Sequence, residues 1–109
     1  MISWDDFEKI DMRVGTILDV KDFENARKPA YQLTIDFGSM GILRSSAQIT
    51  SLYEKEVLAG KQVVAVINFP PKQIANFFSE CLVLGVYNSE NQVVLLQPSI
   101  PVQNGDKIG

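Results

Sequence analysis

Most of the side chains that could recognise a ligand lie in residues 68–85, NFPPKQIANFFSECLVLG. Asn68 comes before a phenylalanine and two prolines, Lys72 follows them, and Ser79 and Glu80 come just before an apolar run. An amide, a hydroxyl and a carboxylate can each form hydrogen bonds with a nucleobase edge or a peptide amide. A lysine adds a salt-dependent contact with phosphate. These residue types predict one rim of a binding groove.

The same residues also have simpler interpretations. Asn68 can simply form a turn, instead of reading a base edge or pinning the loop. Lys72 can be an exposed lysine that only keeps the protein soluble. Ser79 and Glu80 can be a turn residue and a solvated charge in front of a strand. The residues alone leave these alternatives open.

Phe77 and Phe78 are adjacent and come directly before Ser79 and Glu80. Neighbouring side chains in an extended segment point to opposite sides, so we expect one ring in the core and the other at the surface. An exposed ring can stack on an unpaired base or contact an apolar side chain of an unfolded polypeptide. Asn76 tolerates a left-handed backbone, so it can form the preceding turn.

The composition argues against catalysis and against metal binding. The chain has no histidine, which is the commonest general base and metal ligand. Cys81 is the only cysteine, so it has no disulfide or metal-binding partner, and we expect it in the interior as a small apolar residue. Paired carboxylates and glycine-rich phosphate loops do not stand out. We therefore expect no catalytic residue, no metal and no cofactor.

The charge of the chain is weakly acidic and unevenly distributed. The net charge is −3, which argues against a strongly basic nucleic-acid footprint. Residues 1–24 carry most of the excess acid, whereas residues 25–81 hold six basic and four acidic side chains. A single cysteine, an acidic N-terminus and the lack of a long apolar run predict a reduced, cytoplasmic setting without membrane insertion.

Alternating apolar residues predict a mostly β domain that spans residues 1–109. Tyr31, Leu33, Ile35 and Phe37 form the clearest alternation, and a slip after Gly15 indicates a bulge in the first strand. The expected strands are residues 12–20, 31–37, 42–49, 61–69, 81–87 and 92–98. Short helices are expected at the N-terminus, capped by Ser3, and at residues 50–60. A helix between the third and fourth strands is typical of a five-stranded OB-fold Greek-key barrel, here with a C-terminal extension.

Three segments resemble the tRNA-binding domain that occurs alone or attached to aminoacyl-tRNA synthetases: residues 7–20, 45–85 and 93–109. The matching motifs are Asp-hydrophobic-Arg-Val-Gly at residues 11–15, the Asn-hydrophobic-x-Pro stretch at residues 68–71, and the pair Ser79-Glu80. The variants SSAQIT and NFPP resemble the CsaA-type branch, described as secretion chaperones. The resemblance covers nearly the whole chain, and it implies an OB-fold, a homodimer and binding without catalysis.

The resemblance also implies a ligand groove for tRNA or peptide. Its expected residues are Arg44, Ser46, Gln48, Asn68, Lys72, Phe77, Phe78, Ser79 and Glu80. Arg13, in the opening motif, is expected to be structural. The chain departs from the family pattern at Asn76, at Phe78 and at Gln73, which stands where a second basic residue would suit an RNA reader. The changes at Gln73 and Phe78 shift the groove from phosphate binding toward apolar contacts.

The two termini predict a contact between copies of the chain. Ile2, Trp4 and Phe7 lie in a helix too short to be stable alone, and Ile100 and Val102 lie in the C-terminal tail. These residues must pack on their own barrel or on a second copy.

The sequence is compatible with two candidate functions. The first is a chaperone-like homodimer that binds unfolded or export-bound polypeptides, and the second is a structure-specific tRNA-binding protein. An enzyme is disfavoured, because no catalytic constellation is present.

Overall fold

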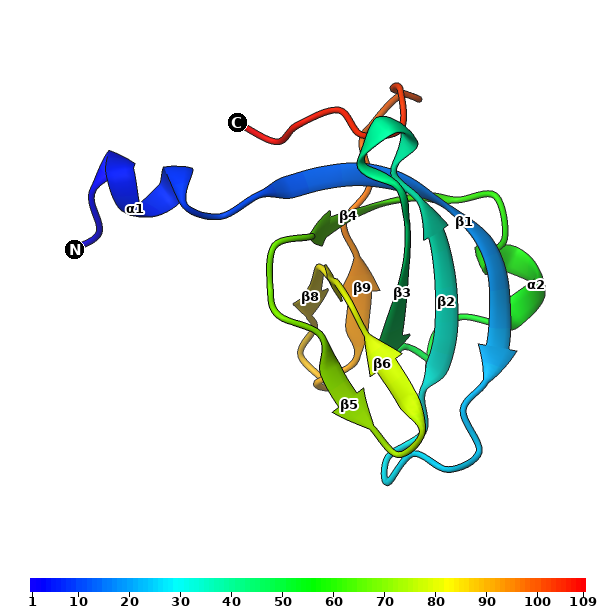
Figure 1. Ribbon diagram of the computed structural model, residues 1–109. Helices are drawn as coiled ribbons and strands as arrows, with labels where there is room; N and C mark the ends of the chain where they lie inside the picture. Colours follow the sequence, from blue (N-terminus) through cyan, green and yellow to red (C-terminus); the bar gives the residue numbers. More distant parts are fainter.

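The computed structural model describes residues 1–109 and is mostly β (Figure 1). Its helical segments are α1 (Trp4–Glu8), the 3-10 turn η1 (Gly38–Met40) and α2 (Lys55–Leu58). Its strands are β1 (Met12–Asp22), β2 (Tyr31–Asp36), β3 (Ile42–Ala47), β4 (Gln62–Val66), β5 (Lys72–Ile74), β6 (Phe77–Ser79), β7 (Leu82–Val83), β8 (Gly85–Tyr87) and β9 (Val93–Leu95).

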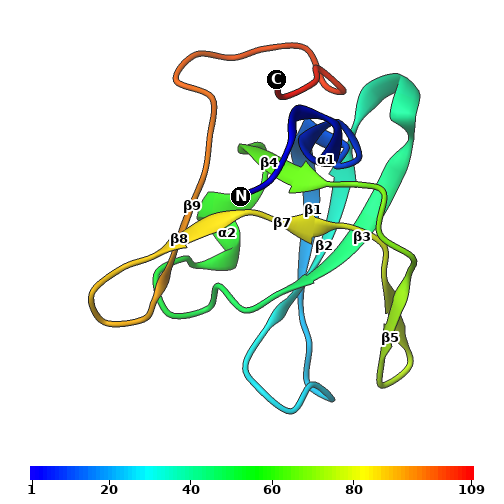
Figure 2. The ribbon, with the colours of Figure 1, turned by 90° about the vertical axis from the view of Figure 1, so that its left-hand side faces the viewer.

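Five strands form one antiparallel sheet in the order β3-β2-β1-β4-β7, which curls into a nearly closed barrel (Figures 1 and 2). The short helix α2 lies between β3 and β4 in the chain. The predicted OB-fold architecture, with its N-terminal helix and C-terminal extension, is confirmed.

The alternation of β2 places one set of side chains in the core. Tyr31, Leu33 and Ile35 are buried, and the residues between them are half-buried on the opposite face. In β4 every residue after Gln62 is buried, as its continuous apolar run predicts. The buried residues of β2 form the main core together with Val63 and Ala65 of β4, Ile17 of β1 and Ala47 of β3.

β1 is long because it pairs with β4 through its first half and with β2 through its second half. The register with β2 shifts between Ile17 and Asp19, so the bulge lies at Leu18 and not beside Gly15, as the sequence had suggested. Gly15 has a different role. A Cβ added there would lie 2.7 Å from the side chains of Ile35 and Phe37, so the core leaves room only for hydrogen.

The segment after β4 forms a separate hairpin, β5–β6, which is not among the strands expected from the sequence. Phe77 is 2% exposed and packs with Phe23 and Ala30 in a second, smaller core, whereas Phe78 is 52% exposed. The expectation that one ring enters the core is confirmed. The positive φ of the turn lies at Ala75 (53°) and not at Asn76.

Two other elements differ in extent from their prediction. The helix expected over residues 50–60 is shorter: it begins after Glu54, and neither Thr50 nor Ser51 caps it. The expected fifth strand is interrupted at Leu84, because β7 pairs with β4 whereas β8 turns away to pair with β9.

The N-terminal helix projects away from the barrel (Figure 1). Ser3 caps it as predicted: its hydroxyl accepts a hydrogen bond from the Asp6 N–H, and the Asp6 carboxylate accepts one from the Ser3 N–H. Bonding to Ser3 lowers the pKa of Asp6. Neither α1 nor α2 is long and apolar enough to cross a lipid bilayer.

The C-terminal tail lies along the edge of β1 that β2 leaves free. The Val14 N–H donates to the Asp106 carbonyl, the Gly105 N–H donates to the Val14 carbonyl, and the Ile108 N–H donates to the Met12 carbonyl. The tail is therefore held by backbone hydrogen bonds where it meets the barrel.

Candidate ligand-binding site

The pair Ser79-Glu80 joins the end of β6 to the edge of β3. The Glu80 N–H donates to the Arg44 carbonyl at 2.7 Å, and the Arg44 N–H donates to Glu80 Oε1 at 2.9 Å. Two residues further along β3, the Ser46 N–H donates to Ser79 Oγ at 3.0 Å. The side chains of Glu80 and Ser79 thus accept hydrogen bonds from β3 that the carbonyls of a paired strand would otherwise accept, and they help to close the barrel.

Cys81 continues this contact toward the interior. Its carbonyl accepts a hydrogen bond from the Ser45 hydroxyl at 2.8 Å, and its side chain belongs to the main core. Burial raises the pKa of the Cys81 thiol to about 12. A thiol that stays protonated at neutral pH is a poor nucleophile, so Cys81 is an apolar residue here, as predicted.

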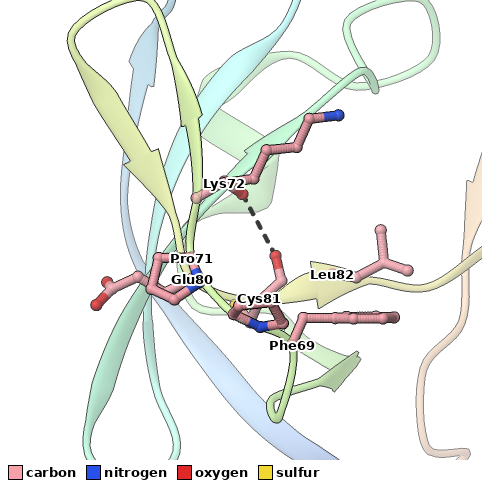
Figure 3. A pocket seen from close by; sticks show the side chains of 8 residues that line it. Phe69, Pro71, Lys72, Glu80, Cys81 and Leu82 are labelled. Atoms are coloured by element: carbon pink, nitrogen blue, oxygen red, sulfur yellow. Dashed lines mark hydrogen bonds between the residues drawn. The ribbon is translucent and has the colours of Figure 1, made fainter.

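A pocket of about 400 Å³ lies beside this junction (Figure 3). It is formed between the loop that follows β4 and the segment that joins β6 to β7. Its lining residues are Phe69, Pro70, Pro71, Lys72, Ser79, Glu80, Cys81 and Leu82. Most of the lining surface is apolar, and Phe69 and Leu82 are each about half exposed.

Three of the residues predicted from the sequence meet in this pocket: Lys72, Ser79 and Glu80. Asn68 lies next to it in the chain, but both ends of its amide already have partners. Its Nδ2 donates to the Lys9 carbonyl at 2.7 Å, and its Oδ1 accepts from the Asp11 N–H at 3.0 Å. This geometry corresponds to the loop-pinning alternative for Asn68.

Arg44 and the two phenylalanines lie outside the pocket. The Arg44 guanidinium carbon is 4.2 Å from the centroid of the Phe77 ring, so the guanidinium covers a ring that Phe23 packs against from another side. Phe78 points to the opposite face of the hairpin and pairs across it with Gln73. The predicted groove residues are thus divided between a pocket and a neighbouring surface.

That neighbouring surface is the outer face of β2 and β3. Arg44 and Ser46 alternate with buried residues of β3, and their cross-strand partners are Thr34 and Gln32. Gln48 is exposed just after β3. These side chains form a polar strip, which lies outside the apolar pocket.

Arg13 has the structural role expected for it. Its Nε lies 2.6 Å from Asp11 Oδ1, and its Nη1 donates to the Gly105 carbonyl at 3.1 Å. The acid, Asp11, comes immediately before β1 in the chain, so the ion pair is local and does not cross the barrel. Arg13 thereby ties the C-terminal tail to the start of β1.

The apolar part of the pocket was not expected from the sequence; it consists of Phe69, Pro70, Pro71 and Leu82. One signal could have revealed it. Proline lacks the N–H that a sheet interior requires, so two prolines directly after Phe69 end the pairing of the strand and leave the ring outside the sheet.

The terminal residues predicted to contact a second copy are mostly exposed. Trp4 is 85% exposed, Ile2, Ile100 and Val102 are also exposed, and Phe7 is half-buried. No group of three or more histidine, cysteine, aspartate or glutamate side chains is arranged to hold a metal ion.

Comparison with known proteins places this geometry in a family. The family model described as "Putative tRNA binding domain" matches residues 12–107. Among solved structures, the chaperone CsaA of Picrophilus torridus is 55% identical with a TM-score of 0.94, and the match covers 100% of both chains. The chaperone CsaA of Bacillus anthracis str. Ames is 50% identical with a TM-score of 0.95, covering 100% of this chain and 99% of that one.

Longer relatives carry the same domain. The methionine–tRNA ligase of Nanoarchaeum equitans (strain Kin4-M) is 37% identical over 108 residues, which are 99% of this chain but only 14% of the ligase. The ligase of Neisseria meningitidis serogroup C (strain 053442) is 35% identical over 98% of this chain and 16% of its own length. This chain therefore belongs to the tRNA-binding domain family, and it is similar over its full length to CsaA chaperones.

Proposed function

We propose that this protein is a non-catalytic, homodimeric binding protein of the CsaA type that holds extended segments of export-bound polypeptides in the cytoplasm. The observation that carries the proposal is the apolar pocket beside the Ser79-Glu80 junction. Phe69 and Leu82 offer half-exposed hydrocarbon surface to it. Burying an apolar side chain there is favourable in proportion to the area removed from water.

The polar residues beside the pocket support the same proposal. Ser79 Oγ and Glu80 Oε1 accept hydrogen bonds from the backbone of β3, so these atoms are already occupied within the protein. A pocket with few free hydrogen-bonding groups suits the hydrocarbon side chains of an unfolded polypeptide. The similarity to proteins named as chaperones is consistent with this use.

The apolar surface at the termini supports the proposed homodimer. Trp4 projects from the barrel on α1, a helix of five residues that no partner in this chain buries, and the exposed Ile2 comes just before this helix. Helices this short are stabilised by packing and not by their own hydrogen bonds. A second copy offers that packing and places two pockets on one particle, which raises avidity for a long chain.

Binding of tRNA is the second candidate function, and the polar strip on β2 and β3 favours it. OB-folds bind oligonucleotides on this face, between the loop after the first strand and the loop after the fourth. Here these loops hold Arg27 and Lys28 on one side and the exposed ring of Phe78 on the other. The Arg44 guanidinium, which lies over the Phe77 ring, adds a cation that makes no ion pair.

Fluorescence anisotropy tests the two candidates with a labelled unfolded peptide and with bulk tRNA, each at low and at physiological salt. We expect the peptide to bind saturably and Phe69→Ala to weaken it, whereas Tyr87→Ala, an exposed aromatic outside the pocket, leaves it unchanged. If only tRNA binds, and Lys28→Glu weakens it, the second candidate replaces the first. Sedimentation that shows a monomer at micromolar concentration would contradict the homodimer.

A further inference from the structure

Two charged residues line the pocket, Glu80 and Lys72. Glu80 Oε1 is held by the Arg44 N–H at 2.9 Å. Figure 3 shows the Glu80 carboxylate turned to the side opposite Phe69 and Leu82. The carboxylate is therefore directed at β3, and it does not face a ligand that occupies the apolar side of the pocket.

Lys72 is the remaining charged residue of the pocket, and it has no acidic partner. The four ion pairs of the chain join other residues: Lys9–Asp6, Arg13–Asp11, Lys21–Asp19 and Lys55–Asp22. Across the hairpin Lys72 faces Ser79, which is neutral. The ammonium group is thus an uncompensated positive charge beside an apolar surface.

An apolar surface with one uncompensated cation at its edge is complementary to a ligand that has an apolar group next to an anion. We infer that the pocket binds an apolar side chain of the polypeptide, with an aspartate or glutamate one or two residues away that pairs with Lys72. This inference rests on the proposed function and makes it specific: the preferred segments are acidic-apolar, and Lys72 selects the acid.

A nucleotide also joins an apolar ring to an anion, but the pocket favours a polypeptide side chain. Reading a base edge requires free donors and acceptors. Ser79 Oγ accepts from the Ser46 N–H and lies 3.5 Å from the Cys81 carbonyl, to which it donates (the dashed line in Figure 3). With Ser79 and Glu80 engaged, a hydrocarbon side chain leaves fewer polar groups unsatisfied than a base would.

Three short fluorescein-labelled peptides test the inference by anisotropy. Each has one leucine in a glycine-serine background, flanked by glutamates in the first peptide, by glutamines in the second and by lysines in the third. We expect the glutamate peptide to bind about three- to fivefold more tightly than the glutamine peptide, which is the scale of one partly exposed ion pair. The lysine peptide should bind most weakly, and added salt should reduce the preference.

Two variants with matched controls assign the preference to residues. Lys72→Met should make the glutamate and glutamine peptides bind equally, and Lys72→Glu should favour the lysine peptide. Lys107→Met, at an exposed lysine of the C-terminal tail, should leave the preference unchanged. Leu82→Ser should weaken all three peptides, whereas Leu52→Ser should not, although the two leucines are similarly exposed at 49% and 43%.

The possible failures are distinguishable. If all three peptides bind equally and Leu82→Ser weakens them, the pocket binds polypeptides but the role of Lys72 is wrong. If no peptide binds to the wild-type protein, both the inference and the proposed function are wrong. If Leu82→Ser weakens a labelled single-stranded RNA and leaves the peptides unchanged, the pocket is a nucleotide site and the inference is overturned.

Discussion

Glu80 and Arg44 are joined twice, by the Glu80 N–H to the Arg44 carbonyl at 2.7 Å and by the Arg44 N–H to Glu80 Oε1 at 2.9 Å. The second bond makes the carboxylate part of the barrel. We therefore expect Glu80→Ala to lower the free energy of unfolding by about 1 kcal/mol, the usual scale of one hydrogen bond. Urea denaturation measures this change.

The controls for this prediction separate the hydrogen bond from the charge. Glu80→Gln keeps a side-chain oxygen that can accept from Arg44, so it should lose less stability than Glu80→Ala. Glu24→Ala removes an exposed carboxylate that forms no ion pair and should have little effect. If Glu80→Ala left stability unchanged but abolished ligand binding, Glu80 would be a direct ligand contact instead.

Asn68 links the N-terminal arm to the wall of the pocket. Its amide holds the Lys9 carbonyl and the Asp11 N–H, and the next residue, Phe69, lines the pocket. We expect Asn68→Ala to loosen the direction in which α1 leaves the barrel and to raise the dissociation constant of the proposed dimer by about three- to tenfold. Sedimentation over a range of concentrations measures it.

Asn68→Asp keeps the acceptor for the Asp11 N–H but loses the donor to Lys9, so its effect on the dimer should be intermediate. Asn25→Ala, in the exposed loop after β1, should have no effect. A dimer that is equally tight in all three variants would show that the direction of the arm does not depend on Asn68.

The barrel could be predicted from the sequence because its long strands alternate with a period of two residues. Tyr31, Leu33 and Ile35 show this directly, and they form the core as expected. The hairpin β5–β6 could not be predicted in the same way, since strands of three residues are too short to show an alternation. Its turn also departs from the usual preference, because Ala75 and not Asn76 has the positive φ.

The structural role of Ser79 and Glu80 could not be predicted from the sequence either. The motif marked both residues as polar and exposed, and they do line the pocket. Their partners Ser46 and Arg44 lie 33 and 36 residues away in the chain, however, and only the closure of the barrel brings them together. Local patterns identify such a pair as important without saying whether it serves a ligand or the fold.

A substitution at Gly15 tests how tightly the core is packed against β1. An added Cβ would lie 2.7 Å from the side chains of Ile35 and Phe37, and both are fully buried. We expect Gly15→Ala to lower the free energy of unfolding by about 1–3 kcal/mol, because neither neighbour has space to move. Gly109→Ala, where nothing lies within 4 Å, is the control. Equal unfolding midpoints for the two variants would disprove this packing argument.

Cys81 gives a pH dependence with a defined sign. Burial raises the pKa of its thiol from 9.0 to about 12, so between these values the folded state binds more protons than the unfolded state. Stability must then fall as pH rises through this window. Burial also raises the pKa of Tyr31, which acts in the same direction.

Denaturation of the wild-type protein and of Cys81→Ala between about pH 8 and about pH 11 separates the contribution of Cys81 from that of Tyr31. This range begins below the ordinary thiol pKa of 9.0 and ends below the raised pKa of about 12. We expect the wild-type protein to lose more stability over this range than Cys81→Ala, whose remaining loss includes that of Tyr31. Native Cys81 should also resist alkylation by iodoacetamide at pH 8 and react once urea unfolds the chain. Rapid alkylation of the native protein would contradict the burial of the thiol.

Phe77 and Phe78 allow a comparison of two identical side chains one residue apart. Phe77 is 2% exposed, packs on Phe23 at 5.3 Å between ring centroids and is covered by Arg44, so Phe77→Ala should cost about 3 kcal/mol of stability. Phe78 is 52% exposed, so Phe78→Ala should change stability by less than about 0.5 kcal/mol. Thermal and urea unfolding measure both values.

The ligand dependence of the same pair distinguishes the two candidate functions. Phe78 lies on the exposed face of the hairpin β5–β6 and does not line the pocket. Phe78→Ala should therefore weaken tRNA if an unpaired base stacks on the ring, since such stacking contributes about 1–3 kcal/mol per base. Peptide binding in the pocket should not change. If Phe78→Ala weakens the peptide and leaves tRNA unaffected, the polypeptide extends beyond the pocket onto the outer face of the hairpin, and the two ligands do not use separate surfaces.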